Sequence, residues 1–154
     1  MNIRMKFKKH GCMKFIGHLD IMRYFQKAIR RADIDIAYSE GFSPHMIMSF
    51  AAPLGVGLTS EGEYVDLQVN SCASSKAAVD ALNSVMVDGM EVVSFKLLPE
   101  NVKNAMSSVA AADYFVKWRE GYVPENWEEK FNAFLQKEEM LIVKKTKRSE
   151  AEVD

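Results

Sequence analysis

An amphipathic segment near the amino terminus constrains the fold of this chain more than any other feature. Apolar residues recur there at steps of three or four, the period of one buried helical face: Leu19, Met22, Phe25, Ile29 and Ala32. This spacing predicts a helix from Gly17 to Ala32, roughly 24 Å long at the usual rise per residue. Because such a helix buries only one face, the flanking segments must supply a second layer.

Alternating segments supply that layer as a sheet. Residues 2–8 alternate between apolar and basic side chains, as a half-buried strand does. Further strands are predicted at 46–50, 62–69 and 90–98. A second helix, capped by Ser74 or Ser75, carries one apolar face made by Ala78, Leu82, Val85 and Met86. The order β-α-β-β-α-β predicts an α+β, ferredoxin-like domain over residues 1–99, with an antiparallel sheet and both helices on one face.

The carboxy-terminal third repeats part of this pattern. Residues 100–111 have no clear periodicity and are predicted to be a linker. In residues 112–154, alternation from Tyr114 to Arg119 precedes a helix after Pro124 and a strand at 140–143. This β-α-β order predicts a partial second ferredoxin-like unit. Either the partial unit packs on the first domain or the chain is truncated; the second interpretation is favoured, because a lone β-α-β leaves sheet edges uncovered.

Composition and motifs exclude several classes of protein. A hydrophobic content of 48% and a charged content of 27% are typical of a soluble globular chain. No apolar run approaches the roughly 20 residues that span a bilayer, and the basic amino terminus lacks the apolar core of a signal peptide. We therefore expect a cytoplasmic protein. Cys12 and Cys72 stand alone and no Cys/His cluster exists, so neither a metal site nor a cofactor is predicted.

Catalytic motifs are sparse. The glycines at 55 and 57 match neither a phosphate-binding loop nor a dinucleotide fingerprint. Glu61 and Glu63 have the composition of a general acid and base pair, but a solubilising role at a hairpin edge is the favoured interpretation. We assign no catalytic residue and expect no catalytic activity of the chain's own.

Charge is distributed unevenly along the chain. Residues 1–50 carry nine Lys/Arg against four Asp/Glu, a net charge of +5, whereas residues 51–154 carry eleven against seventeen, a net charge of −6. The cations of the predicted helix lie largely off its apolar face. Together with two lysines of the first strand they form a predicted surface for a nucleic acid, favoured to be RNA, or for a protein partner: Arg23, Lys27, Arg30, Arg31, Lys6 and Lys8. The alternative is a solvated charged face.

A turn-rich loop at residues 38–45 lies between the helix and the second strand. His18 begins the predicted helix and His45 ends the loop, so we expect both to meet at one end of the sheet. Tyr38 and Ser43 complete a predicted polar loop pocket. The alternative for each histidine is a capping or packing role.

Three segments together resemble a known family. They are GHLDIMRYFQKAIRRA (17–32), AYSEGFSPHMIMSFAAPLGVGL (37–58) and SEGEYVDL (60–67). In this order they resemble the bacterial radical-SAM-linked family, a domain of unknown function found beside or fused behind radical SAM proteins. The resemblance is dense over residues 15–67 and thinner up to 147. It implies a radical SAM protein as partner. The chain lacks the three closely spaced cysteines of such an enzyme, so it is a companion and not the enzyme itself.

The sequence leaves three functional hypotheses. The first is an accessory module that binds RNA or presents substrate to the radical SAM protein. The second is a purely structural docking domain for that protein. The third is a ferredoxin-fold endoribonuclease, which the missing carboxy-terminal glycine-rich loop and the incomplete second unit disfavour.

Overall fold

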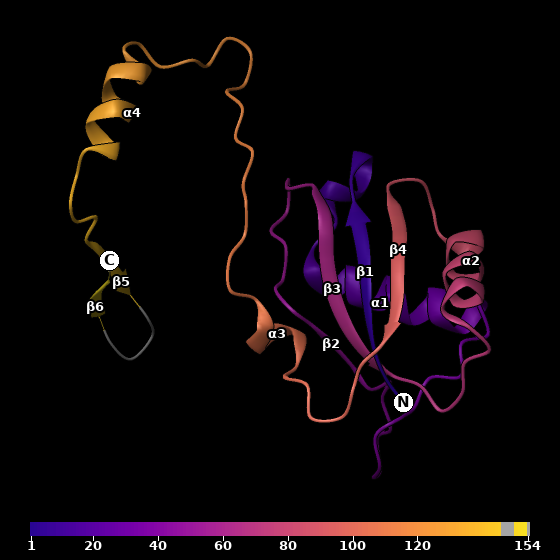
Figure 1. The fold of residues 1–154 in the computed structure, drawn as a ribbon. Helices are drawn as coiled ribbons and strands as arrows, with labels where there is room; N and C mark the ends of the chain where they lie inside the picture. Colours follow the sequence, from indigo (N-terminus) through magenta and orange to yellow (C-terminus); the bar gives the residue numbers. More distant parts are fainter. Residues whose placement is uncertain (146–149, 154) are drawn as a thin grey trace. The chain divides into compact units, whose positions relative to one another are not determined.

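The structure, a computed structural model, describes residues 1–145 and 150–153, which belong to two compact units, 1–112 and 113–154. The first unit contains an extended sheet and its helices (Figure 1). The second contains a helix and a strand pair. In the described residues, no helix is both long enough and apolar enough to cross a membrane.

The first unit is built on a four-stranded antiparallel sheet with strand order β2-β3-β1-β4. Its strands are β1 (Asn2–Lys9), β2 (Met48–Phe50), β3 (Ser60–Gln68) and β4 (Met90–Leu97). The central strand β1 pairs with both β3 and β4, so that Met5 lies opposite Val65 on one side and Phe95 on the other. The predicted α+β class with an antiparallel sheet is therefore confirmed.

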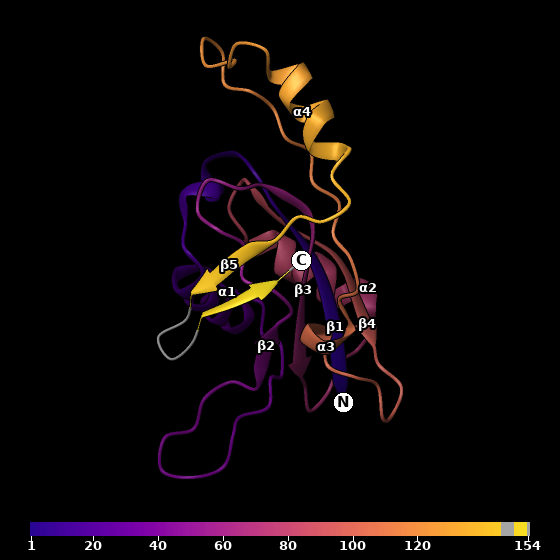
Figure 2. The same ribbon diagram turned by 90° about the vertical axis from the view of Figure 1, so that its left-hand side faces the viewer.

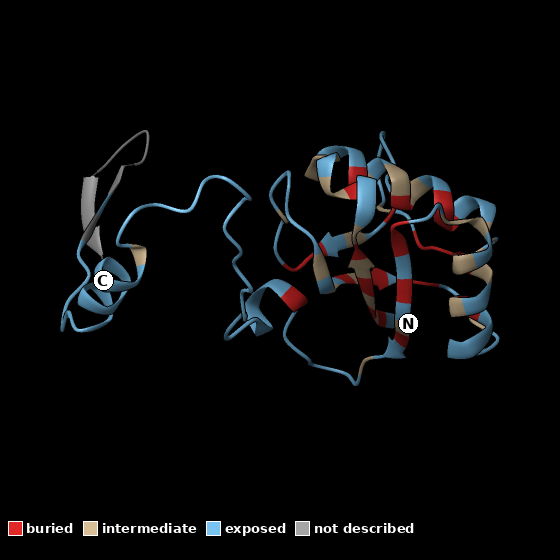
Figure 3. Cartoon of the chain, turned by 90° about the horizontal axis from the view of Figure 1, so that it is seen from above, coloured by how far each residue is buried: buried red, intermediate tan, exposed pale blue. Residues whose placement is uncertain are grey.

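Two helices, α1 (His18–Arg31) and α2 (Ser75–Val85), pack on the same face of this sheet (Figure 3). Alternation along β1 turns Ile3, Met5 and Phe7 toward them into the core. The predicted cap of α2 is present, since the Ser74 hydroxyl accepts a hydrogen bond from the Ala77 N–H at 3.0 Å.

Several details depart from the plain ferredoxin-like arrangement that we expected. A 3-10 helix, η1 (Gly11–Phe15), is inserted between β1 and α1. Strand β2 has only 3 residues, and the chain before it forms only two isolated bridges in the described residues, at Ile36 and Tyr38. A short helix, α3 (Ala105–Ser108), contacts β2 and β3. The sheet and its helices match the expectation, whereas these insertions do not.

The buried face of α1 is rotated from the predicted one. Its buried residues are Ile21, Phe25, Ala28 and Ile29. Leu19, which we placed on the buried stripe, is 62% exposed. The reason is the position of Phe25, whose ring packs edge-on against Phe7 at 4.7 Å and against Phe50 at 5.8 Å between centroids. That aromatic cluster fixes the rotation of the helix and turns its first-turn leucine outward.

The junction between α2 and β4 depends on a glycine. Gly89 has φ +90°, a conformation that residues with a side chain rarely adopt. Its backbone also approaches the chain that follows β1, because its carbonyl accepts a hydrogen bond from the His10 N–H at 2.9 Å. A Cβ at this position would lie 2.7 Å from the His10 carbonyl oxygen. Both backbone conformation and space therefore require glycine here.

Part of the segment 100–111, which we predicted to be a linker, is anchored to the sheet. Ala105 is 3% exposed, and its N–H donates a hydrogen bond to the Asp66 carboxylate at 2.6 Å. The Arg4 guanidinium binds the same carboxylate at 2.8 Å and also donates to the Lys103 carbonyl at 2.9 Å. These polar contacts hold the segment against the face opposite α1, where α3 contacts β2 and β3.

The second unit contains α4 (Trp127–Leu135) and an antiparallel pair, β5 (Ile142–Lys145) and β6 (Glu150–Val153). The predicted helix and the strand after it are present, but no strand forms at residues 114–119, so the predicted β-α-β order is wrong. Tyr114, Phe115 and Val116 are all more than 75% exposed, so this alternating stretch buries neither of its faces. Alternation alone does not make a strand when no partner strand lies beside it.

Candidate functional site

The first candidate surface is the basic face of α1. Arg23, Lys27, Arg30 and Arg31 are all exposed, because the helix buries the face around Phe25. The Arg23 guanidinium pairs with the Asp20 carboxylate at 3.0 Å. In the described part of the chain, Lys27 and the two arginines that end the helix form no ion pair. Three uncompensated cations therefore lie on one helix.

Lys6 and Lys8 do not belong to this surface, contrary to the grouping that we predicted. Neighbouring residues of β1 face the helices, so these two lysines lie on the opposite face of the sheet. The Lys8 ammonium lies 3.3 Å from the Glu61 carboxylate and 3.7 Å from that of Glu91. The hydrogen bond to Glu61, helped by both negative charges, raises the pKa of Lys8. Its charge is thus already compensated.

The two histidines that we expected to meet lie at opposite ends of β2. The His18 ring packs edge-on against Phe50, the last residue of β2, with centroids 5.2 Å apart. His45 precedes the strand, and its Nδ1 lies 2.8 Å from the Ser39 hydroxyl. Five residues of extended chain separate positions 45 and 50, which is roughly 16 Å at the usual strand rise. A shared histidine site is therefore wrong.

The predicted loop pocket is likewise not formed. The loop extends from the sheet as a hairpin, closed by the Ser39 N–H, which donates to the His45 carbonyl at 2.9 Å (Figure 2). Tyr38 is 46% exposed, Ser43 is exposed, and Phe42 is fully exposed. These three side chains of the loop are therefore exposed to solvent.

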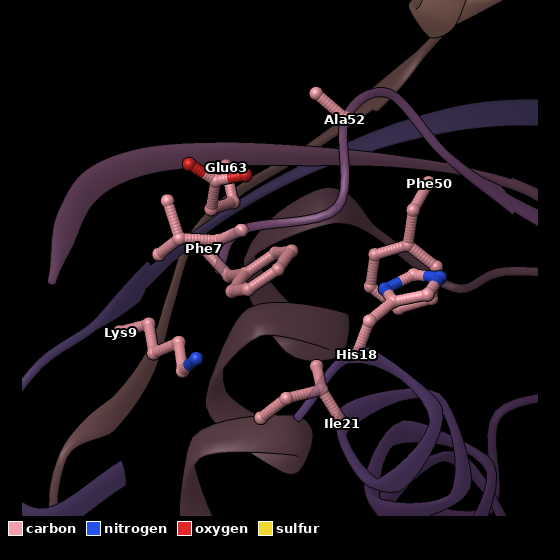
Figure 4. A pocket seen from close by; sticks show the side chains of 8 residues that line it. Phe7, Lys9, His18, Ile21, Phe50, Ala52 and Glu63 are labelled. Carbon is pink, nitrogen blue, oxygen red and sulfur yellow. The ribbon is translucent and has the colours of Figure 1, made fainter. Parts of the chain in front are cut away.

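His18 instead lines a small cavity with residues that sequence reasoning did not single out together (Figure 4). The Lys9 side chain is 2% exposed, and its ammonium donates to the Ile16 carbonyl at 2.9 Å. Burial lowers the pKa of Lys9, an effect that the nearby negative charge of Glu63 opposes. The alternation along β1 could have predicted the burial of Lys9, because this residue is the next inward-facing position after Phe7. The free volume is about 10 Å³, which admits one water molecule and no substrate.

A larger groove, of about 340 Å³, contains His45. It lies between β2, β3 and the segment after β4, and its lining mixes apolar and neutral polar side chains: Asn2, Ile47, Ser49, Gln68, Leu98 and Val102. Asp66 also borders it, but Arg4 and the Ala105 N–H occupy that carboxylate. In the described residues no cluster of His, Cys, Asp and Glu is arranged to hold a metal ion. The groove therefore combines apolar surface with hydrogen-bonding side chains.

The fold defines an α+β domain with an antiparallel sheet, and a comparison with known families places the chain in one of them. Residues 2–154 match a family described as an uncharacterized protein conserved in bacteria, DUF2344, and the chain belongs to this family. The match covers both compact units. No curated protein matches the chain. The family description names no partner, so linkage to a radical SAM protein stays a prediction.

Proposed function

We propose that this chain is an accessory module that binds RNA and serves a radical SAM protein, without a reaction of its own. The observation that carries this proposal is the set of exposed cations on α1, Lys27, Arg30 and Arg31, which form no ion pair in the described residues. The spacings of three and four residues bring these charges together on the helix surface, where like charges repel. A polyanion relieves that repulsion, and arginine binds phosphate through two parallel hydrogen bonds.

The fold adds support by analogy. The strand order β2-β3-β1-β4, with two helices on one face, is similar to a ferredoxin-like sheet without matching it in every element. Ferredoxin-like sheets recur in RNA-binding proteins, although a shared fold does not by itself define a function. The argument for RNA therefore depends on the charges of α1 and not on the fold.

The salt dependence of binding tests this proposal. Each phosphate contact on a single strand contributes a slope of about −0.7 to log K against log salt. Lys27, Arg30 and Arg31 together therefore predict a slope of about −2. Changing both arginines to alanine should weaken binding and flatten the slope by about 1.4, while Arg23→Ala, which removes a cation already paired with Asp20, serves as the matched control. A slope unchanged by the double substitution would contradict the proposal.

A structural docking domain is the second candidate, and one observation favours it. Phe42 lies in the hairpin before β2 and is fully exposed, which is unusual for a large aromatic side chain unless a partner covers it. A pull-down with the radical SAM protein tests this candidate. Docking would be favoured over RNA binding by two results together. The Phe42→Ser variant would lose the complex with the radical SAM protein, and the wild-type chain would bind no RNA.

A further inference from the structure

The face of the sheet opposite α1 and α2 carries a second, separate group of polar side chains. The register of the strands places Lys6 between Tyr64 of β3 and Ser94 of β4, and Arg4 beside Lys96. The segment that contains α3 covers the Asp66 end of this face. Around Lys6 the face stays open, and Tyr64 is 37% exposed.

Ion pairs occupy both ends of this face and leave its middle uncompensated. At one end Arg4 pairs with Asp66 at 2.8 Å, and at the other Lys8 lies 3.3 Å from Glu61. Between them, Lys6 forms no ion pair in the described part of the chain. The middle of the face therefore holds a free cation beside an exposed aromatic ring.

The side chain of Lys6 lies flat on the sheet because Gly62 leaves room for it. A Cβ at Gly62 would lie 2.8 Å from Cε of Lys6 and 3.4 Å from its Nζ. In this position the Lys6 ammonium lies 5.9 Å from the centroid of the Tyr64 ring. The absence of a side chain at Gly62 thus leaves the space in which the Lys6 ammonium lies near the aromatic ring.

We propose that this open face binds one nucleotide unit of a single-stranded RNA, with the base stacked on Tyr64 and its phosphate held by Lys6. The inference rests on the proposed function, because it identifies the surface of the chain that contacts a base of the bound RNA. A nucleotide joins a planar aromatic group to an anion, and this face offers an exposed ring next to a free ammonium group. Paired bases cannot stack on a flat side chain, so the ligand is a single strand.

The test uses the full chain and a fluorescent oligoadenylate of about 16 nucleotides, the upper end of the length that one binding surface covers. Tyr64→Ala should weaken binding by about 5- to 150-fold, the usual effect of removing one stacked base, and should leave the salt slope unchanged. Tyr64→Phe, which keeps the ring, should bind like the wild type. Lys6→Gln should reduce the salt slope by about 0.7.

Two further variants separate the effect of the position of the Lys6 side chain from the effect of removing a lysine charge. Gly62→Ala retains the Lys6 charge but displaces its side chain, so it should weaken binding in the same direction as Lys6→Gln. Lys8→Gln removes a lysine of the same strand and the same face whose charge Glu61 already compensates, so it should have little effect. Urea midpoints equal to that of the wild type establish that each variant is folded.

Particular outcomes would overturn the inference. One is a Tyr64→Ala variant that binds the oligoadenylate as tightly as the wild type, and another is an abasic oligomer that binds equally well. If the Arg30 and Arg31 substitutions abolish binding while Tyr64→Ala does not, the inference fails and the proposed function stands. If the wild-type chain binds no RNA, both fail. Loss of a protein partner on Tyr64→Ala, with RNA binding intact, would identify the face as a protein-docking surface instead.

Discussion

Replacing Phe25 with alanine tests the packing of α1 on the sheet. The Phe25 side chain is 0% exposed and lies at the centre of the aromatic cluster. Its ring contacts that of Phe7 at 4.7 Å, that of Phe50 at 5.8 Å and that of Tyr24 at 5.9 Å between centroids. All of these contacts are edge-on or nearly so, the geometry that aromatic pairs prefer. The substitution therefore removes the side chain that joins the helix to β1 and β2.

The magnitude follows from the area that this ring removes from water. A buried aromatic side chain covers at least about 150 Å². At about 25 cal/mol per Å², its loss costs about 4 kcal/mol, within the range of roughly 3–5 kcal/mol seen when buried phenylalanine is truncated. For an m-value of about 2 kcal/mol per molar urea, the midpoint of unfolding should fall by about 2 M.

Urea titration followed by circular dichroism measures this shift, and Leu19→Ala is the matched control on the same helix. Leu19 is 62% exposed, so its truncation should change the free energy of unfolding by less than about 0.5 kcal/mol. Phe25→Leu, which keeps part of the buried volume, should fall between the two and remains measurable if the alanine variant does not fold. Equal losses for Phe25→Ala and Leu19→Ala would refute the orientation of α1 described here.

Two predictions concern the pH dependence of stability. Burial lowers the pKa of Lys9 below 10.5, so the unfolded chain binds this proton more tightly, and folding becomes more favourable as pH rises through the lowered pKa toward 10.5. Lys9→Met should flatten that rise in urea midpoints measured against pH, and a profile as steep as that of the wild type would contradict it. Hydrogen bonds from Asn70 and Ser71 lower the pKa of Asp35 below 3.8. The stabilisation by Asp35 is present above pH 3.8 and is lost as pH falls through the lowered pKa, so Asp35→Asn should reduce the loss of stability in acid titrations.

The sequence was sufficient to predict the sheet, because strand alternation is a local property. In β3 and the residue that follows it, for example, Val65, Leu67 and Val69 are buried as their alternation predicts. The rotation of α1 was not predictable in the same way. Two overlapping apolar stripes fit a helical period, one through Leu19 and Met22 and the other through Ile21 and Ala28. The contacts of Phe25 with rings on β1 and β2 decide between them, and those contacts are not local.

The segment at 100–111 shows a second limit of sequence patterns. Its anchor is a polar network, in which the Asp66 carboxylate accepts hydrogen bonds from Arg4 and from the Ala105 N–H. Such a network joins residues far apart in the chain and leaves no periodic signal, so a segment without periodicity was interpreted as a linker. The burial of a single alanine, Ala105, was likewise invisible before the fold was known.

The separation of the cations into two faces changes how RNA binding has to be tested. The alternation of β1 already implied this separation, since a helix packed on Phe7 lies on the face of the sheet opposite Lys6. We did not predict it because we grouped the cations by their positions in the sequence. The sheet and a layer of helix lie between Tyr64 and Arg30, so a strand of about four nucleotides cannot contact both. With so short a probe, substitutions on only one face should weaken binding. With a strand of about 16 nucleotides, substitutions on both faces should weaken it additively, since sites far apart act independently. A short probe that responds to both faces would show that the two surfaces do not bind RNA directly and that the variants act through the fold.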